Sequence, residues 1–274
     1  MHAFVSLNQK ILSPDEAKLP AISSAAFYGK GVFTTAAIYR GNPFLWEKHW
    51  QRLNENAAKI GIDLSGFSEE TVKDALSGII DQNGFENGRA RITFFDETAS
   101  GIWSRGTNRK TSFLITTADF REAKNLSLTV SPYRINSKSP LANVKSCNYL
   151  ENILALEAAK ASGFDEAVRL NERGEAASAC LANLFWIKDG QIFTPALETG
   201  CLAGTTRSLL LEICDVEEKT ASAEELNEAD EIFLTSAGIG IGKVGKFENK
   251  IFKGELTNTI LDKAFPFHRS FSLD

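Results

Sequence analysis

One stretch organises the rest of this chain: Ser139-Pro-Leu-Ala-Asn-Val-Lys-Ser-Cys-Asn-Tyr-Leu-Glu-Asn152. It places a single lysine, Lys145, just ahead of an amphipathic helix that we expect from about Tyr149 to Ala161 and that Gly163 would end. Burial of that lysine would lower its pKa. A neutral amine is the form that Schiff-base chemistry with a carbonyl or with pyridoxal 5'-phosphate (PLP) requires. A solvated surface lysine is the alternative, and other segments must decide between the two.

The totals describe a globular protein of ordinary size. The 274 residues, 43% apolar and 24% charged, suffice for one large domain or two medium ones. A net charge of −5 gives no electrostatic footprint for nucleic acid or an anionic membrane. We find no signal peptide and no apolar run near the roughly 20 residues of a spanning helix. These features predict a cytoplasmic protein with no nucleic-acid or membrane partner.

Metal and nucleotide motifs are not found in the sequence. The chain has four cysteines, Cys147, Cys180, Cys201 and Cys214, and no two of them form a C-x-x-C pair. Three histidines are too few for a His-rich metal site, and neither Gly-rich nucleotide fingerprint can be read. We therefore expect no metal, and if the chain is an enzyme, a cofactor supplies its difficult chemistry.

The first part of the chain predicts a small α/β domain over residues 1–118. Helical periodicity runs from Leu45 to Ile60, and Ser68 would cap a second helix. Strands are expected at residues 3–12, 28–39, 91–96 and 112–117, with a hairpin turn at 40–43. Residues 97–110, rich in Gly, Ser and Thr, predict a loop, and residues 119–125 predict a linker.

The remaining residues, 126–274, predict a larger domain that includes Lys145. Strands are expected at 126–131, 166–170, 183–188, 191–193 and 231–235. Helices are expected from Thr205 and, through a capping-box pattern, from Ser222. The last strand runs into a glycine-rich segment, residues 236–242.

The order of these segments resembles the class-IV aminotransferases, the PLP enzymes of fold type IV. Motifs similar to those of that family run from about Phe27 to Val244: Gly29–Phe33, His49-Trp-Gln-Arg-Leu53, Lys145-Ser-Cys-Asn-Tyr-Leu150, Asn183-Leu-Phe, Thr194-Pro, Leu202-Ala-Gly-Thr-Thr-Arg207 and Ala229–Thr235. The resemblance implies an α/β (α+β) protein of two domains, a small α/β domain and a larger pseudo-barrel domain.

The resemblance also implies roles for individual residues. Lys145 would hold PLP covalently and then move the proton at the substrate Cα. Arg52 would bind the cofactor phosphate, which a guanidinium matches in shape and charge. Thr205 and Thr206 would offer N–H groups and hydroxyls to the same phosphate at a helix N-terminus. A solvated helix arginine and simple N-capping are the alternatives for these positions.

Three further positions follow from the same resemblance. Tyr149 would lie beside the cofactor and hydrogen-bond its phenolic oxygen, or else be a buried aromatic of the helix. Ser236 and Ala237, in the turn after Thr235, would supply another phosphate donor.

One position departs from the family pattern. Ser178 stands where the family usually has a glutamate that pairs with the pyridine nitrogen of PLP and keeps it protonated. A serine can hydrogen-bond that nitrogen, but it cannot hold a proton on it by charge. Glu175 would point to the opposite face of a strand and is a poor substitute. Ser178 therefore argues against a standard transaminase.

Two stretches, Phe33-Thr34-Thr35-Ala36 and Cys180–Trp186, resemble 4-amino-4-deoxychorismate lyase within this family. The leading hypothesis is accordingly a lyase that releases 4-aminobenzoate and pyruvate. The substrate of that reaction is an anionic dicarboxylate, which Arg91 or Arg105 would bind. Tyr28, Phe33 and Thr34 or Thr35 are the other substrate-side candidates.

Two alternatives stay open. One is a transaminase that uses a branched-chain or D-amino acid with 2-oxoglutarate. The other is a PLP-binding protein with little turnover. In each case the resemblance implies a small amino substrate and a homodimer with a shared active site.

Overall fold

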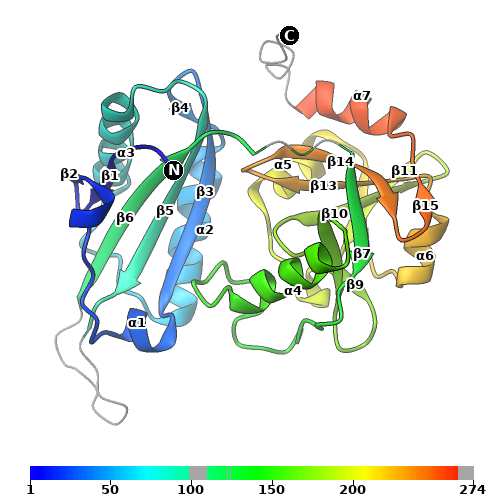
Figure 1. Ribbon diagram of the computed structural model, residues 1–274, viewed down its shortest axis with the longest axis horizontal. Coiled ribbons are helices and arrows are strands. Elements are labelled where there is room, and N and C mark those ends of the chain that lie inside the picture. The colour runs from blue at the N-terminus through cyan, green and yellow to red at the C-terminus, as the bar shows by residue number, and fades with distance from the viewer. Residues whose placement is uncertain (99–109, 122, 124, 265–274) are drawn as a thin grey trace. The chain divides into compact units, whose positions relative to one another are not determined.

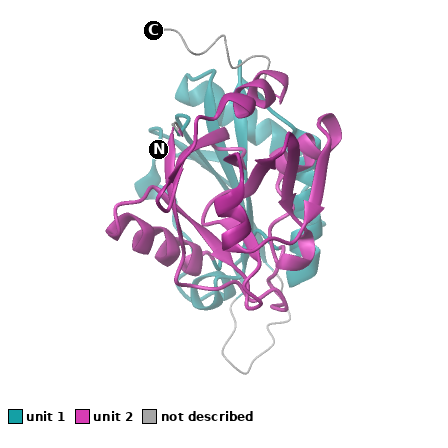
Figure 2. Cartoon of the chain, turned by 90° about the vertical axis from the view of Figure 1, so that its right-hand side faces the viewer, with its two compact units in different colours: residues 1–121, 144–148 teal, residues 122–143, 149–274 magenta. Residues whose placement is uncertain are grey.

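The computed structural model describes residues 1–98, 110–121, 123 and 125–264. Its contacts divide the chain into unit 1, residues 1–121 and 144–148, and unit 2, residues 122–143 and 149–274 (Figure 2). The first boundary falls in the expected linker. Residues 144–148 differ from the expectation, because they group with unit 1 through their pairing with one of its strands. Most of the loop expected at 97–110, including Arg105, lies outside the described residues.

Unit 1 is built on an antiparallel sheet whose strand order is β2-β1-β6-β5-β3-β4 (Figure 1). Its strands are β1 (Val5–Leu7), β2 (Lys10–Leu12), β3 (Gly31–Tyr39), β4 (Asn42–Pro43), β5 (Gly88–Asp96) and β6 (Thr111–Ala118). The single strand expected at residues 3–12 is a hairpin instead. Asn8 and Gln9 have φ of 50° and 68°, the positive values that a two-residue hairpin turn requires.

Two long helices cover one face of this sheet (Figure 1). They are α2 (Trp46–Ile60) and α3 (Glu69–Asn83), and both confirm the sequence prediction. The hydroxyl of Ser68 accepts a hydrogen bond from the Thr71 N–H and starts α3. A short helix, α1 (Ser24–Tyr28), precedes β3 and was not expected.

The alternation of side chains along β3 places polar groups beside α2. Val32 and Ile38 face the helices and belong to the apolar core of unit 1. Thr34, on the same face, is also fully buried. Phe33 and Thr35 point to the other face of the sheet. A hydroxyl is thus buried under α2, where only a polar partner on that helix can satisfy it.

Unit 2 holds a mixed sheet in the order β12-β11-β10-β13-β14-β7-β8-β9, with β15 paired to β14. Its strands are β7 (Leu126–Val130), β8 (Glu166–Leu170), β9 (Ala176–Ala179), β10 (Asn183–Lys188), β11 (Gln191–Pro195), β12 (Val216–Lys219), β13 (Glu231–Ser236), β14 (Gly240–Phe247) and β15 (Lys250–Ile251). β9, at one end of this order, also contacts β10. The sheet therefore curls on itself as a half-barrel, which confirms the expected fold class.

The helices of unit 2 are α4 (Leu150–Ala161), α5 (Thr205–Ile213), α6 (Ala223–Glu228) and α7 (Glu255–Ala264). The first three confirm the predicted helices. The glycine-rich segment 236–242 contains a turn and the start of β14, which the sequence did not indicate because glycines carry no side-chain pattern. Within the part of the chain described, no helix has the length and apolar character to cross a membrane.

Candidate active site

The segment that carries Lys145 pairs with the edge of β3 through an isolated antiparallel bridge between Val32 and Ser146. The Phe33 N–H donates to the Lys145 carbonyl at 3.0 Å, and the Cys147 N–H donates to the Gly31 carbonyl at 2.8 Å. On its other side, the Lys145 N–H donates to Asn56 Oδ1 of α2 at 2.6 Å. A Cβ on Gly31 would lie 2.8 Å from Cys147 Sγ, so glycine permits this close approach. The backbone of the lysine is fixed by β3 and by α2.

The Lys145 amine lies over an aromatic ring beside two other cations. Its Nζ is 4.5 Å from the centroid of the Phe33 ring. Burial, together with the positive charges of Arg52 and Arg91, lowers the pKa of Lys145 to about 7. A lysine with this pKa is substantially neutral at physiological pH and can act as a nucleophile or as a base.

Arg91, on β5, also lies over the Phe33 ring. Its guanidinium carbon lies 3.6 Å from the centroid of the Phe33 ring, and its Nε donates to Thr93 Oγ1 at 3.2 Å. Thr35 is the Cα partner of Arg91 across the sheet, so the two side chains share a face. Phe33 therefore carries two cationic groups, an arrangement suited to an anionic molecule.

Arg52 is held by a buried chain of hydrogen bonds. Its Nη2 donates to Thr34 Oγ1 at 2.7 Å, and the same oxygen lies 2.6 Å from His49 Nδ1. Because an arginine can only donate, Thr34 accepts from Arg52. The Thr34 hydroxyl thus joins Arg52 to His49. Burial first, and then the charges of Arg52 and Lys145, hold the pKa of His49 well below its usual value.

The other predicted residue of unit 1 lies apart from this cluster. Tyr28 ends α1, is 47% exposed, and packs edge-on against Phe27, with ring centroids 6.0 Å apart. The cluster thus consists of Lys145, Arg52, Phe33 and Arg91 from the prediction, joined by Thr34 and His49. The sequence motif contained His49 but gave no sign that Thr34 links it to Arg52.

In unit 2 the N-terminus of α5 brings together Thr205 and Thr206, both buried. Asn183, on β10, fixes the preceding turn, because its Nδ2 donates to the Leu202 carbonyl at 2.7 Å. Gly204 is the N-cap, and a Cβ there would lie 2.0 Å from Asn183 Oδ1. Glycine is therefore required for this turn, and the first N–H groups of α5 form a site that favours an anion.

A buried hydroxyl lies next to Asn183 on the neighbouring strand. Thr235 is the Cα partner of Asn183, is fully buried, and its Oγ1 has no hydrogen-bond partner within the described residues. Ser236 and Ala237 follow it at the start of a turn, both half-buried. Ala237 can offer only its backbone N–H. Helix N–H groups and hydroxyls are donors that suit a phosphate, so the residues present fit the phosphate group of PLP.

Tyr149 and Ser178 also belong to unit 2. Tyr149 is the N-cap residue of α4, and its carbonyl accepts from the Asn152 N–H at 3.1 Å. Ser178 is half-buried on β9 and is the Cα partner of Arg169 on β8. Glu175 does not replace the missing carboxylate, since it accepts from Arg173 Nη2 at 2.6 Å and from Asn171 Nδ2 at 2.7 Å. Arg169 was not predicted from the sequence.

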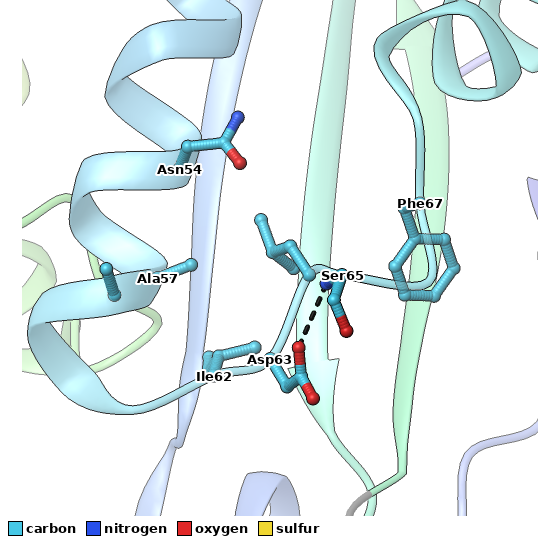
Figure 3. A pocket seen from close by; sticks show the side chains of 8 residues that line it. Asn54, Ala57, Ile62, Asp63, Ser65 and Phe67 are labelled. Atoms are coloured by element: carbon cyan, nitrogen blue, oxygen red, sulfur yellow. Dashed lines mark hydrogen bonds between the residues drawn. The ribbon is translucent and has the colours of Figure 1, made fainter.

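A separate cavity of about 360 Å³ lies in unit 1 at the end of α2 (Figure 3). It is lined by Asn54, Ala57, Ala58, Ile62, Asp63, Leu64, Ser65 and Phe67. None of the predicted site residues is among them. In the described ranges no three His, Cys, Asp or Glu side chains group as metal ligands.

Comparison with known proteins shows what this chain is similar to. Residues 31–247 match the family model described as amino-transferase class IV. A putative branched-chain-amino-acid aminotransferase from Methanocaldococcus jannaschii is 27% identical, with 94% of each chain covered. The aminodeoxychorismate lyase of Bacillus subtilis is 28% identical over 93% of this chain and 92% of its own. A crystal structure of a branched-chain aminotransferase from Thermoproteus uzoniensis superposes with a TM-score of 0.90 at 25% identity, covering 99% of this chain and 96% of the other.

The family match spans most of the chain and contains the motifs that carry the resemblance, except for the first two residues of Gly29–Phe33. The match to the solved structure covers both units. The chain therefore belongs to the class IV aminotransferase family, whose members are PLP-dependent enzymes.

Proposed function

We propose that this protein is a PLP-dependent lyase that converts 4-amino-4-deoxychorismate into 4-aminobenzoate and pyruvate. The observation that carries the proposal is the cluster around Phe33, where an amine of pKa about 7, Lys145, lies beside Arg52 and Arg91. The substrate offers an amino group and two carboxylates. An activated amine surrounded by guanidinium groups matches that combination.

The cofactor supplies an aldehyde that links to amines and a ring that accepts electrons. We propose that Lys145 binds PLP covalently, and that Arg52, Thr205 and Thr206 bind its phosphate, with Ser236 and Ala237 as further donors. Thr34 and His49 keep the Arg52 guanidinium oriented for that role. Tyr149 hydrogen-bonds the phenolic oxygen.

In the elimination, a proton leaves the ring carbon that carries the amino group, and the enolpyruvyl oxygen leaves the neighbouring carbon. The substrate amine would take the place of Lys145 on the cofactor, and the freed Lys145 amine, substantially neutral near pH 7, would take that proton. The enolpyruvyl group picks up a proton as it becomes pyruvate, and the remaining ring is the aromatic 4-aminobenzoate. Arg91 binds a substrate carboxylate, with Phe33 and Thr35 beside it.

The lyase is preferred over a transaminase because of Ser178. A carboxylate at that position would hold a proton on the pyridine nitrogen and strengthen the ring as an electron acceptor, and a serine lacks that charge. A relative named aminodeoxychorismate lyase, 28% identical, is consistent with this choice.

The test is turnover of 4-amino-4-deoxychorismate by PLP-loaded protein with no keto acid present. Many equivalents of 4-aminobenzoate and pyruvate per protein are expected, and Lys145→Ala should abolish both. Lys59→Ala, on the exposed end of α2, is the matched control and should leave the rate unchanged. Failure to form either product refutes the lyase.

A transaminase is the second candidate, favoured by the 94% coverage of an aminotransferase relative. It requires that a branched-chain or D-amino acid converts bound PLP to its amine form, and that 2-oxoglutarate reverses the change. If PLP binds to Lys145 but neither assay gives turnover, the protein is a PLP-binding protein of little activity. We further propose that the protein is cytoplasmic and forms a homodimer, as the family resemblance implies. Sedimentation can test the homodimer.

A further inference from the structure

A buried arginine faces the same side of the sheet as Ser178. Arg169, on β8, is 2% exposed and is the Cα partner of Ser178 on β9. Side chains of directly paired residues lie on one face, with Cβ atoms about 4.5–5.5 Å apart. A buried cationic residue therefore shares a sheet face with Ser178, which occupies the position of the family's usual carboxylate.

Neutral acceptors hold the Arg169 guanidinium in place. Its Nη1 donates to Asn152 Oδ1 at 3.2 Å, and its Nη2 donates to the Arg134 carbonyl at 3.2 Å. Asn152 is itself fixed, because its Nδ2 donates to the Cys180 carbonyl at 2.6 Å. Among the described residues one carboxylate contacts it, that of Glu151 at 3.4 Å, and the Glu151 side chain is 76% exposed, so water screens its charge. The charge of Arg169 is thus only partly compensated.

Two polar atoms of this pair lack partners within the described part of the chain. Arg169 Nε is buried and donates to nothing. Ser178 Oγ, half-buried, makes no hydrogen bond there either. An unsatisfied buried donor costs roughly 1–3 kcal/mol, so a native protein rarely keeps one without a ligand or function that uses it. Both atoms can donate a hydrogen bond to an added acceptor.

We infer that Ser178, with Arg169 beside it, receives the pyridine nitrogen of PLP as a hydrogen-bond acceptor and keeps that nitrogen unprotonated. This inference rests on the proposed function, which brings PLP to Ser178. The serine hydroxyl donates to the nitrogen lone pair. The buried positive charge of Arg169, on the same face of the sheet, disfavours a second positive charge at the nitrogen, because like charges repel.

The consequence concerns the kind of reaction that the site supports. An unprotonated ring withdraws electrons weakly, so negative charge at the substrate Cα is poorly stabilised. Transamination, which must keep that charge until a proton returns at another carbon, becomes slow. An elimination that expels a leaving group and creates an aromatic ring depends less on electron withdrawal by the pyridine ring. The Arg169–Ser178 pair is a determinant of reaction type.

The test reads the ring nitrogen directly. The protein is loaded with PLP labelled with ¹⁵N in the ring, and its NMR shift is followed from pH 6 to 9. We expect the unprotonated shift throughout in the wild-type protein. Ser178→Glu should raise the pKa of the ring nitrogen by about 1–3 units. Ser178→Gln, of the same size but uncharged, is the matched control and should leave it unprotonated.

Arg169 is tested in the same spectra. Arg169→Leu removes the cation and should raise the pKa of the ring nitrogen, whereas Arg169→Lys keeps the charge and should not. A protonated nitrogen in the wild-type protein at neutral pH would overturn the inference, as would equal spectra for Ser178→Glu and Ser178→Gln. If Arg169→Leu does not fold, the two Ser178 variants still decide.

Failure of the proposed function gives a different result. Borohydride reduction followed by mass spectrometry reports whether PLP is attached to Lys145, whatever the state of the ring nitrogen. Attached PLP with a protonated nitrogen overturns the inference alone. Protein that attaches no PLP overturns both.

Discussion

Thr34→Val removes one buried hydroxyl and keeps the shape of the side chain. In the folded protein that hydroxyl accepts from Arg52 at 2.7 Å and is hydrogen-bonded to His49 Nδ1 at 2.6 Å, and all three residues are buried. A hydrogen bond from a charged group contributes about 1.5–3 kcal/mol and a neutral one about 0.5–1.5 kcal/mol. Loss of both should lower the free energy of unfolding by about 2–4 kcal/mol.

The same change should weaken PLP binding. Arg52 loses one acceptor that orients its guanidinium, so part of that order must be restored when the phosphate binds. We expect the Kd for PLP to rise about tenfold, which corresponds to about 1.4 kcal/mol. The assays are urea unfolding of the apo protein and titration of apo protein with PLP followed by absorbance.

Thr111→Val is the matched control, since Thr111 begins β6, is half-buried, and makes no side-chain hydrogen bond in the described residues. It should leave both quantities within error of wild type. A Thr34→Val protein with unaltered Kd for PLP but reduced stability would show that Thr34 supports the fold and does not position Arg52. Unaltered stability would refute the buried chain of hydrogen bonds itself.

Three further predictions follow from other contacts. The pKa of Lys145 is about 7 in the folded protein and about 10.4 in the unfolded chain. Between these pH values the unfolded state binds more protons, so the free energy of unfolding rises with pH across that window. Lys145→Met should remove this contribution, and equal pH profiles of stability for the variant and the wild type would contradict the pKa shift. Gly204→Ala should raise the Kd for PLP at least about tenfold, because the added Cβ displaces the start of α5 from Asn183. In Gly78→Ala the added Cβ has no atom within 4 Å, so this variant should stabilise α3 by about 0.5–1 kcal/mol in urea unfolding. Glu231→Gln should destabilise α7 by about 1–2 kcal/mol, because the carboxylate accepts from the Leu256 and Thr257 N–H groups; unaltered hydrogen exchange in α7 would count against this contact.

Short-range sequence patterns predicted the helices whose formation depends on residues close together in the chain. The periodicity of α2 and the Ser68 cap of α3 are encoded within a few neighbouring residues, and both helices formed where they were expected. β9 was missed because a short run of alanine and serine carries little strand signal, and β14 was missed because glycines interrupt its apolar residues. Their formation depends on pairing with distant strands.

The site shows the same division. Arg52 and Lys145 stand in recognisable motifs, but the link from Arg52 through Thr34 to His49 depends on how α2 lies on β3. The pairing of Arg169 with Ser178 depends on a register shift between Arg169 and Leu170, so counting residues along the two strands could not give it. Long-range register decides which polar side chains meet.

The chain passes between its two units three times, after residues 121, 143 and 148, and this has a consequence for biosynthesis. When the first 121 residues leave the ribosome, β3 still has an open edge beside Gly31 and Phe33, because the segment that pairs there has not been made. An open strand edge is a template for pairing with another chain. A fragment of residues 1–121 should therefore aggregate at concentrations where the full chain refolds, and a peptide of residues 140–150 should suppress that aggregation. Synthesis of the Lys145 segment thus also covers the open edge of β3 and ends the period in which the nascent chain can aggregate through it.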